Sequence, residues 1–125
     1  MNIQLAITAL VGLSSVLIGS YAEHSLREQV SEEMIRKFMT GLRYHQNYSI
    51  VLLILSLVQY LNISDKAKSR FSIAFWIFLF AVITFCASVY LFVISNTAWV
   101  SYIAPVGGIS LMLSWLYLAY CALRT

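Results

Sequence analysis

The stretch Gly41-Leu42-Arg43-Tyr44-His45-Gln46-Asn47-Tyr48 decides how the fold is interpreted, because it places polar side chains directly before a long apolar run. Residues 49–61, which follow it, contain no charged side chain. Together the two parts span residues 41–61, close to the roughly 20 residues that a membrane-spanning helix needs. The stretch therefore predicts a span with a polar cluster at its front end.

The composition of the whole chain supports a membrane setting. Of 125 residues, 61% are hydrophobic and 10% are charged, against soluble averages of roughly 45–50% and about 25%. A soluble domain of this size could not bury so much apolar surface, so lipid must cover it. The net charge of +3 is small and the basic residues lie in loops, so nucleic acid is not expected as a partner.

Apolar segments separated by short polar loops predict an all-α integral membrane protein. The whole chain, residues 1–125, is expected to form a single four-helix transmembrane domain. The four expected spans cover residues 3–22, 41–61, 71–95 and 100–123. The first is interpreted as a retained helix and not a signal peptide, because no Lys or Arg precedes it and its apolar stretch is too long.

Small residues recur at helical spacing along three of these spans. In the first span they alternate steps of four and three, and in the third and fourth they recur every seven residues. The positions are Thr8, Gly12, Ser15, Gly19, Ala22, Ala74, Ala81, Ser88, Ser95, Gly107, Ser114 and Cys121. Such seams let helix backbones approach closely in lipid. They predict a compact, left-handed four-helix bundle, with packing contacts at Gly12, Gly19, Gly107 and Gly108.

Residues 31–40 are expected to form a short amphipathic helix between the first two spans. Ser31 is a suitable N-cap, and Glu32 and Glu33 follow at the end of the helix that favours negative charge. An apolar stripe that includes Ile35 and Phe38 runs along the other face. This pattern is typical of a helix that lies in the headgroup region, before the chain turns into the bilayer at residue 41.

The polar cluster of the second span needs partners, because a charge near the membrane edge is costly unless it is paired. Glu23 and His24 close the first span on the same side, so we expect Glu23 to form an ion pair with Arg43 or to interact with it through His24. His45 is expected to point elsewhere. The candidate polar cluster comprises Glu23, His24, Arg43, Tyr44, Asn47, Ser88 and Tyr90.

Three functions remain open for this cluster. It could bind a small molecule, an ion or a lipid headgroup at one leaflet. Alternatively, Arg43, Glu23 and His24 could be a structural clasp that fixes the first two helices, in a protein that serves as a structural or accessory subunit of a larger membrane complex or as a homo-oligomer. The third alternative is a membrane enzyme that acts on a lipid-soluble substrate. A non-enzymatic role is favoured, and no catalytic residue, metal site or cofactor is predicted, because the sequence contains no corresponding motif.

The basic residues decide the expected orientation only narrowly. Four lie on the side of both termini and four on the opposite side. They are Lys66, Lys68, Arg70 and Arg124, and Arg27, Arg36, Lys37 and Arg43, respectively. Because Arg43 is expected to face the bundle and the other opposite basic residues are interleaved with glutamates, we expect both termini in the cytoplasm.

Several motifs resemble one known family. They are Gly19-Ser20-Tyr21-Ala22-Glu23-His24, Gly41-Leu42-Arg43-Tyr44, Phe85-Cys86-Ala87-Ser88-Val89-Tyr90 and Ala104-Pro105-Val106-Gly107-Gly108, followed by Trp115. This order resembles the YgdD/YwdK-like small inner-membrane proteins, the domain of unknown function 423, which are similar to the eukaryotic transmembrane protein 256. The resemblance implies four spans in a bacterial inner membrane, and it implies no activity.

The chain departs from the family pattern at three places. The family has no acid where Glu23 stands, and a histidine is expected where this chain has Tyr48, with His45 a turn earlier. The Ser-Gly-Ser-x-Tyr pattern of the third span becomes residues 86–90 of this chain, Cys-Ala-Ser-Val-Tyr. A family mechanism that needs two histidines would therefore lack one of them here.

Overall fold

The computed structural model describes all residues from 1 to 125, and helices connected by short turns account for nearly the whole chain. The four long helices are α1 (Ile3–Tyr21), α3 (Glu32–Leu57), α4 (Asp65–Ser95) and α5 (Ala104–Leu123). The short elements between them are η1 (Ala22–Leu26), a π-helical turn, α2 (Arg27–Gln29), η2 (Val58–Tyr60) and η3 (Ala98–Tyr102). The all-helical prediction is confirmed.

Side chains at the helix ends explain where three of these helices begin. Asn2, Ser31 and Ser64 accept hydrogen bonds from backbone N–H groups in the first turns of α1, α3 and α4. These bonds satisfy donors that have no partner within the helix. At its other end, α4 stops at Asn96, whose backbone is left-handed with φ 52°, a conformation that Asn tolerates better than most residues.

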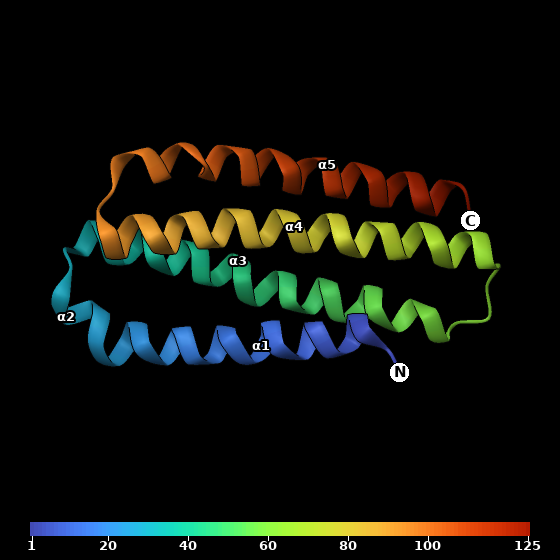
Figure 1. Cartoon of the computed structure of the whole chain (residues 1–125), viewed down its shortest axis with the longest axis horizontal. Coiled ribbons are helices and arrows are strands. Elements are labelled where there is room, and N and C mark those ends of the chain that lie inside the picture. Colours follow the sequence, from blue (N-terminus) through green and yellow to red (C-terminus); the bar gives the residue numbers. More distant parts are fainter.

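The four long helices lie side by side in a row (Figure 1). α1 packs against α3, α3 against α4, and α4 against α5, and no extensive contact joins α1 to α5 or to α4. This row differs from the compact bundle that the sequence predicts, in which the first and last helices would also pack together. The two chain termini lie on the first and last helices of the row, at the same end of the helices (Figure 1).

Three parts of the chain are long and apolar enough to cross a membrane: Ile3–Gln29, Asp65–Ser95 and Ala98–Leu123. Large hydrophobic side chains such as Leu10 and Leu116 are exposed on their outer faces, as expected for helices in lipid. α3 is not among the three, because the polar run of residues 43–49 lies in its middle. The chain is a multi-pass membrane protein.

The seven-residue seams are buried between the helices, except at Ser95, which is exposed. Buried members are Thr8, Ser15, Ala22, Ala74, Ala81, Ser88, Gly107, Ser114 and Cys121. The approach is closest at Gly107, where an added Cβ would lie 2.5 Å from the backbone nitrogen of Phe85. At Gly19 an added Cβ would make only an ordinary contact of 3.5 Å with Leu42.

Gly12 and Gly108 do not lie at close helix contacts. A Cβ added at either position would meet no atom within 4 Å. The packing contacts predicted for these two glycines are therefore wrong. The seven-residue period includes Gly107 but not Gly108, and Gly12 lies off the Thr8–Ser15–Ala22 line.

Residues 32–40 are helical, but they do not form a separate helix that turns into the bilayer at residue 41. They are the first turns of α3, which continues without interruption to Leu57. Ile35 and Phe38 are buried against Ala22, Leu26 and the α4 residue Val93. The apolar stripe therefore packs on protein, which removes the reason for a separate helix among the headgroups.

Candidate ligand-binding site

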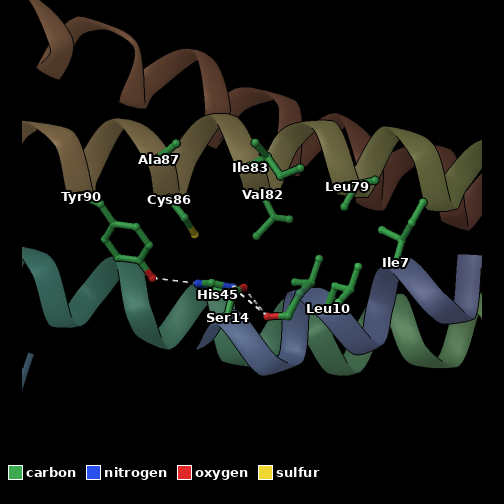
Figure 2. A pocket seen from close by; sticks show the side chains of 11 residues that line it. Ile7, Leu10, Ser14, His45, Leu79, Val82, Ile83, Cys86, Ala87 and Tyr90 are labelled. Carbon is green, nitrogen blue, oxygen red and sulfur yellow. Dashed lines mark hydrogen bonds between the residues drawn. The ribbon is translucent and has the colours of Figure 1, made fainter. Parts of the chain in front are cut away.

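His45 is the centre of the polar cluster that lies inside the row (Figure 2). Its side chain is only 8% exposed, and it contacts α1 and α4 at the same time. Nδ1 lies 3.0 Å from the hydroxyl of Tyr90. Nε2 lies 3.0 Å from Ser14 Oγ and 3.0 Å from the carbonyl oxygen of Val11. One imidazole on α3 therefore links both neighbouring helices.

The Val11 carbonyl determines where the protons of this cluster lie, because a carbonyl oxygen can only accept hydrogen bonds. Nε2 therefore carries a proton and donates it to Val11, and Nδ1 of the neutral ring accepts from the Tyr90 hydroxyl. Ser14 also donates to the Val11 oxygen, at 2.7 Å. The protons of His45 Nε2, Ser14 and Tyr90 are therefore all donated within the protein. The oxygens Ser14 Oγ and Tyr90 Oη keep free lone pairs.

This proton arrangement bears on catalysis, since Ser14, His45 and Tyr90 have the spacing of a nucleophile, a base and an orienting group. A catalytic histidine takes the serine proton on Nε2 while the third group holds a proton on Nδ1. Here Nε2 already carries its proton toward Val11, so it cannot accept the proton of Ser14. The cluster is arranged as a polar anchor and not as an acyl-transfer centre.

An apolar groove of about 360 Å³ runs between α1 and α4, and His45 lines it (Figure 2). It exists because these two helices flank α3 without packing closely against each other. Nine of its eleven lining residues are hydrophobic, and Leu10 and Ile83 are more than half exposed. In a bilayer, lipid chains would therefore reach the groove directly. No cluster of His, Cys, Asp or Glu side chains suited to a metal ion exists in the chain.

Gly41 explains how the Tyr90 hydroxyl reaches His45. A Cβ at position 41 would lie 3.0 Å from Val89 Cγ1 and 3.3 Å from Tyr90 Cε1, so the glycine lets α4 approach α3 closely. The Tyr90 ring then packs on the ring of Phe38, with 4.7 Å between centroids. Gly41 also receives a hydrogen bond from the Cys86 thiol at its carbonyl oxygen, at 3.3 Å.

Three residues of the sequence-predicted cluster lie inside the protein, and only Tyr90 joins His45 there. Tyr44 stacks on Phe85, with 4.8 Å between ring centroids. Ser88 is buried, and its hydroxyl donates to the Phe85 carbonyl of its own helix at 2.7 Å. Tyr44 therefore contributes to packing between α3 and α4, and neither of these two side chains joins the polar cluster.

The predicted ion pair between Glu23 and Arg43 is wrong. Glu23 instead pairs with Arg27, one helical turn away in sequence, at 3.1 Å. Arg43 makes no ion pair, and together with Asn47, Glu23 and His24 it is exposed. Because Glu23 and Arg27 lie on one continuous helical path through η1 and α2, the local pair forms without help from α3.

Sequence reasoning missed Ser14 as a site residue and expected His45 to point away. A signal was present: His45 lies seven residues after Phe38 and seven before Leu52, and both of these are fully or nearly fully buried. A seven-residue period places all three on one helix face. Ser14 carried no such signal, because its contact depends on how α1 is placed beside α3.

Comparison with known proteins agrees with a membrane setting for the chain. Residues 18–108 match the family described as Protein of unknown function (DUF423). The UPF0382 membrane protein YwdK of Bacillus subtilis is 21% identical over 99% of this chain and 98% of its own length. A UPF0382 membrane protein of Haemophilus influenzae is 27% identical over 99% of this chain and 96% of its own length.

A UPF0382 membrane protein of Staphylococcus epidermidis is 23% identical, and the match covers 99% of this chain and 98% of the relative. No solved structure matches the chain. The similarity to the eukaryotic transmembrane protein 256 stays a prediction. Because the family match covers most of the chain and the relatives match over almost their whole length, the chain belongs to the DUF423 family of membrane proteins.

Proposed function

We propose that this protein crosses the bacterial inner membrane four times and binds a lipid-soluble hydroxyl compound in the groove between α1 and α4, without catalysing a reaction. The observation that carries the proposal is the buried His45, which is hydrogen-bonded to three backbone or side-chain partners beside an apolar groove. A polar centre with this surrounding fits a ligand with an apolar chain and one polar group.

The position of α3 supports a fourth span. It packs between α1 and α4, both of which are apolar enough to cross the membrane. Its 26 residues correspond to a length of about 39 Å, which exceeds the roughly 30 Å of the hydrocarbon core. A helix of this length that lies between two spans crosses the bilayer with them.

The proposed orientation has both termini in the cytoplasm, with Lys66 and Lys68 on the same side. We expect an impermeant maleimide to label a Glu28→Cys variant in intact bacteria and a Lys66→Cys variant only after lysis. The natural Cys86 and Cys121 are buried and would be replaced by alanine in both variants. The reverse labelling pattern would mean that the termini face outward.

The hydrogen-bond pattern of the cluster supports a ligand that donates. Ser14 Oγ and Tyr90 Oη have lone pairs left, but their protons and that of His45 Nε2 are already donated. A hydroxyl group can donate to these oxygens, whereas a carboxylate would meet only acceptors. Long-chain or isoprenoid alcohols and acylglycerols have this chemistry, with an apolar tail to fill the rest of the groove.

Photolabelling of the purified protein with a diazirine analogue of hexadecanol tests this proposal. We expect labelled peptides from α1 and α4, and competition by hexadecanol that is about three- to tenfold stronger than by its methyl ether, the value of one hydrogen bond. Hexadecanoate should compete less well than the alcohol.

Two exposed isoleucines provide a matched pair of variants. Ile83 lines the groove and is 53% exposed, while Ile109 on α5 is 57% exposed and lies away from it. Ile83→Trp should reduce the labelling strongly, and Ile109→Trp should leave it unchanged. Equal labelling of both variants would show that the probe only dissolves in the surrounding detergent or lipid, and the proposal would fail.

The alternative role as an accessory subunit has less support. Small-residue seams on the outside of the protein would favour packing against another membrane protein or a second copy. The seven-residue seams of α1, α4 and α5 are instead buried within the chain. They are already used by contacts between its own helices.

A further inference from the structure

A second groove lies between α2 and α3, on the opposite side of α3 from His45. It encloses about 340 Å³, and three of its seven lining residues are arginines: Arg27, Arg36 and Arg43. Arg36 and Arg43 are seven residues apart and share one face of α3. Arg27 approaches the groove from α2. Three guanidinium groups from two segments therefore line one small space.

The charges around this groove are unbalanced. Arg27 is paired with Glu23 at 3.1 Å, and Glu32 is the single acidic residue in the lining. Arg36 and Arg43 form no ion pair with any residue of the chain. Two guanidinium groups thus face one unpaired carboxylate, and an anion of one negative charge would complete the balance.

The depth of Arg43 makes its lack of a partner costly. It lies eleven residues after Glu32, the first residue of α3, which corresponds to about 16 Å along the helix. On the same face, the next turn presents the exposed Asn47, and the turns after it present Ile50 and Ile54, which are 58% and 60% exposed. A cation beside such a lipid-facing surface extends toward the interface, where water and anionic headgroups can stabilise it.

We propose that this groove binds the phosphate of an anionic phospholipid, whose acyl chain lies along Ile50 and Ile54. Arginine suits this ligand because its planar guanidinium donates two parallel hydrogen bonds to a phosphate. Free phosphate shares the headgroup chemistry, but the exposed apolar face that begins at Ile50 favours a lipid.

Native mass spectrometry can test this site separately from the His45 groove. The protein would be titrated with dioleoylphosphatidylglycerol, with dioleoylphosphatidylcholine, and with inorganic phosphate. We expect preferential retention of phosphatidylglycerol, and a loss of about tenfold or more in the Arg36→Gln, Arg43→Gln double variant, since each surface charge contributes about fivefold. A Lys66→Gln, Lys68→Gln double variant also removes two positive charges, but at the opposite end of the helices. It should retain the lipid as well as the wild type does.

Each remaining outcome is informative. Equal retention of both lipids by the wild type, or unchanged retention by the arginine double variant, would overturn the proposal. Displacement of the lipid by inorganic phosphate alone, without selectivity between the two lipids, would overturn the lipid assignment in favour of free phosphate. If the double variant does not fold, the single variants Arg36→Gln and Arg43→Lys replace it. Weaker retention by Arg36→Gln than by wild type then supports the site, and unchanged retention by both overturns it.

Discussion

Replacing Gly107 by alanine is expected to destabilise the protein by about 1–3 kcal/mol, the usual cost of forcing extra atoms into a packed interior. The added Cβ would lie 2.5 Å from the backbone nitrogen of Phe85, 2.6 Å from its Cα and 2.7 Å from its Cβ. Backbone atoms cannot rotate away as a side chain would, so α5 must shift away from α4. Gly107→Leu should have a larger effect, and thermal unfolding in detergent measures both.

Gly108 is the matched control for this prediction. It is the next residue of the same helix, and a Cβ added there meets nothing within 4 Å. Gly108→Ala should therefore be neutral or stabilise by about 0.4–1 kcal/mol through the lower entropy of the unfolded chain. If Gly107→Ala melted at the same temperature as Gly108→Ala, the close contact between α4 and α5 would be wrong.

Replacing His45 by leucine is expected to have the second-largest effect. The free energy of unfolding should fall by about 2 kcal/mol, and binding of the proposed hydroxyl ligand should be lost. The imidazole makes hydrogen bonds to Ser14, Val11 and Tyr90, and each bond between membrane helices contributes about 0.6 kcal/mol on average. Leucine keeps the apolar volume but leaves the Tyr90 hydroxyl without its acceptor. The chain should still fold through its buried seams, with α1 held less firmly.

Gln46→Leu is the control for this substitution, because Gln46 is the next residue of α3 and is exposed. The thermal unfolding of both variants, and their photolabelling with the hexadecanol probe, would be compared. A His45→Leu variant with unchanged stability and unchanged labelling would show that the cluster neither joins the helices nor holds a ligand.

The periodic parts of the sequence predicted the packing of the helices well. A residue that recurs every seven positions stays on one helix face whatever the neighbours are. For this reason the Ala74–Ala81–Ser88 and Gly107–Ser114–Cys121 lines could be predicted as buried seams. The all-helical character follows from the same apolar periodicity.

The polar cluster could not be predicted in the same way, because it depends on which sides of α3 are covered. Arg43 and His45 lie two residues apart and so point to nearly opposite faces. The sequence suggested that the charged side chain would seek a buried partner. In the structure the charge stays outside and the neutral imidazole lies inside, which avoids the larger cost of burying an ion.

The prediction for residues 31–40 failed for a related reason. An amphipathic helix has an apolar stripe whether it lies on a membrane or on protein. The sequence could not specify that Ala22, Leu26 and Val93 would cover this stripe. Because these residues cover the stripe, the helix continues from Thr40 into Gly41 without a break.

The row of helices has a consequence for how the chain enters the membrane. α1 is synthesised first, yet the long helix that it contacts extensively is α3, which emerges later. α1 must therefore persist alone in lipid, and its many exposed apolar side chains, including Leu10, Leu13, Val16 and Leu17, suit it to do so. In the proposed four-span arrangement α3 is in the opposite position, because it carries polar and charged residues and is covered by a helix on each side only after α4 has been inserted beside it. Insertion of the least apolar helix is thus tied to helices made both before and after it.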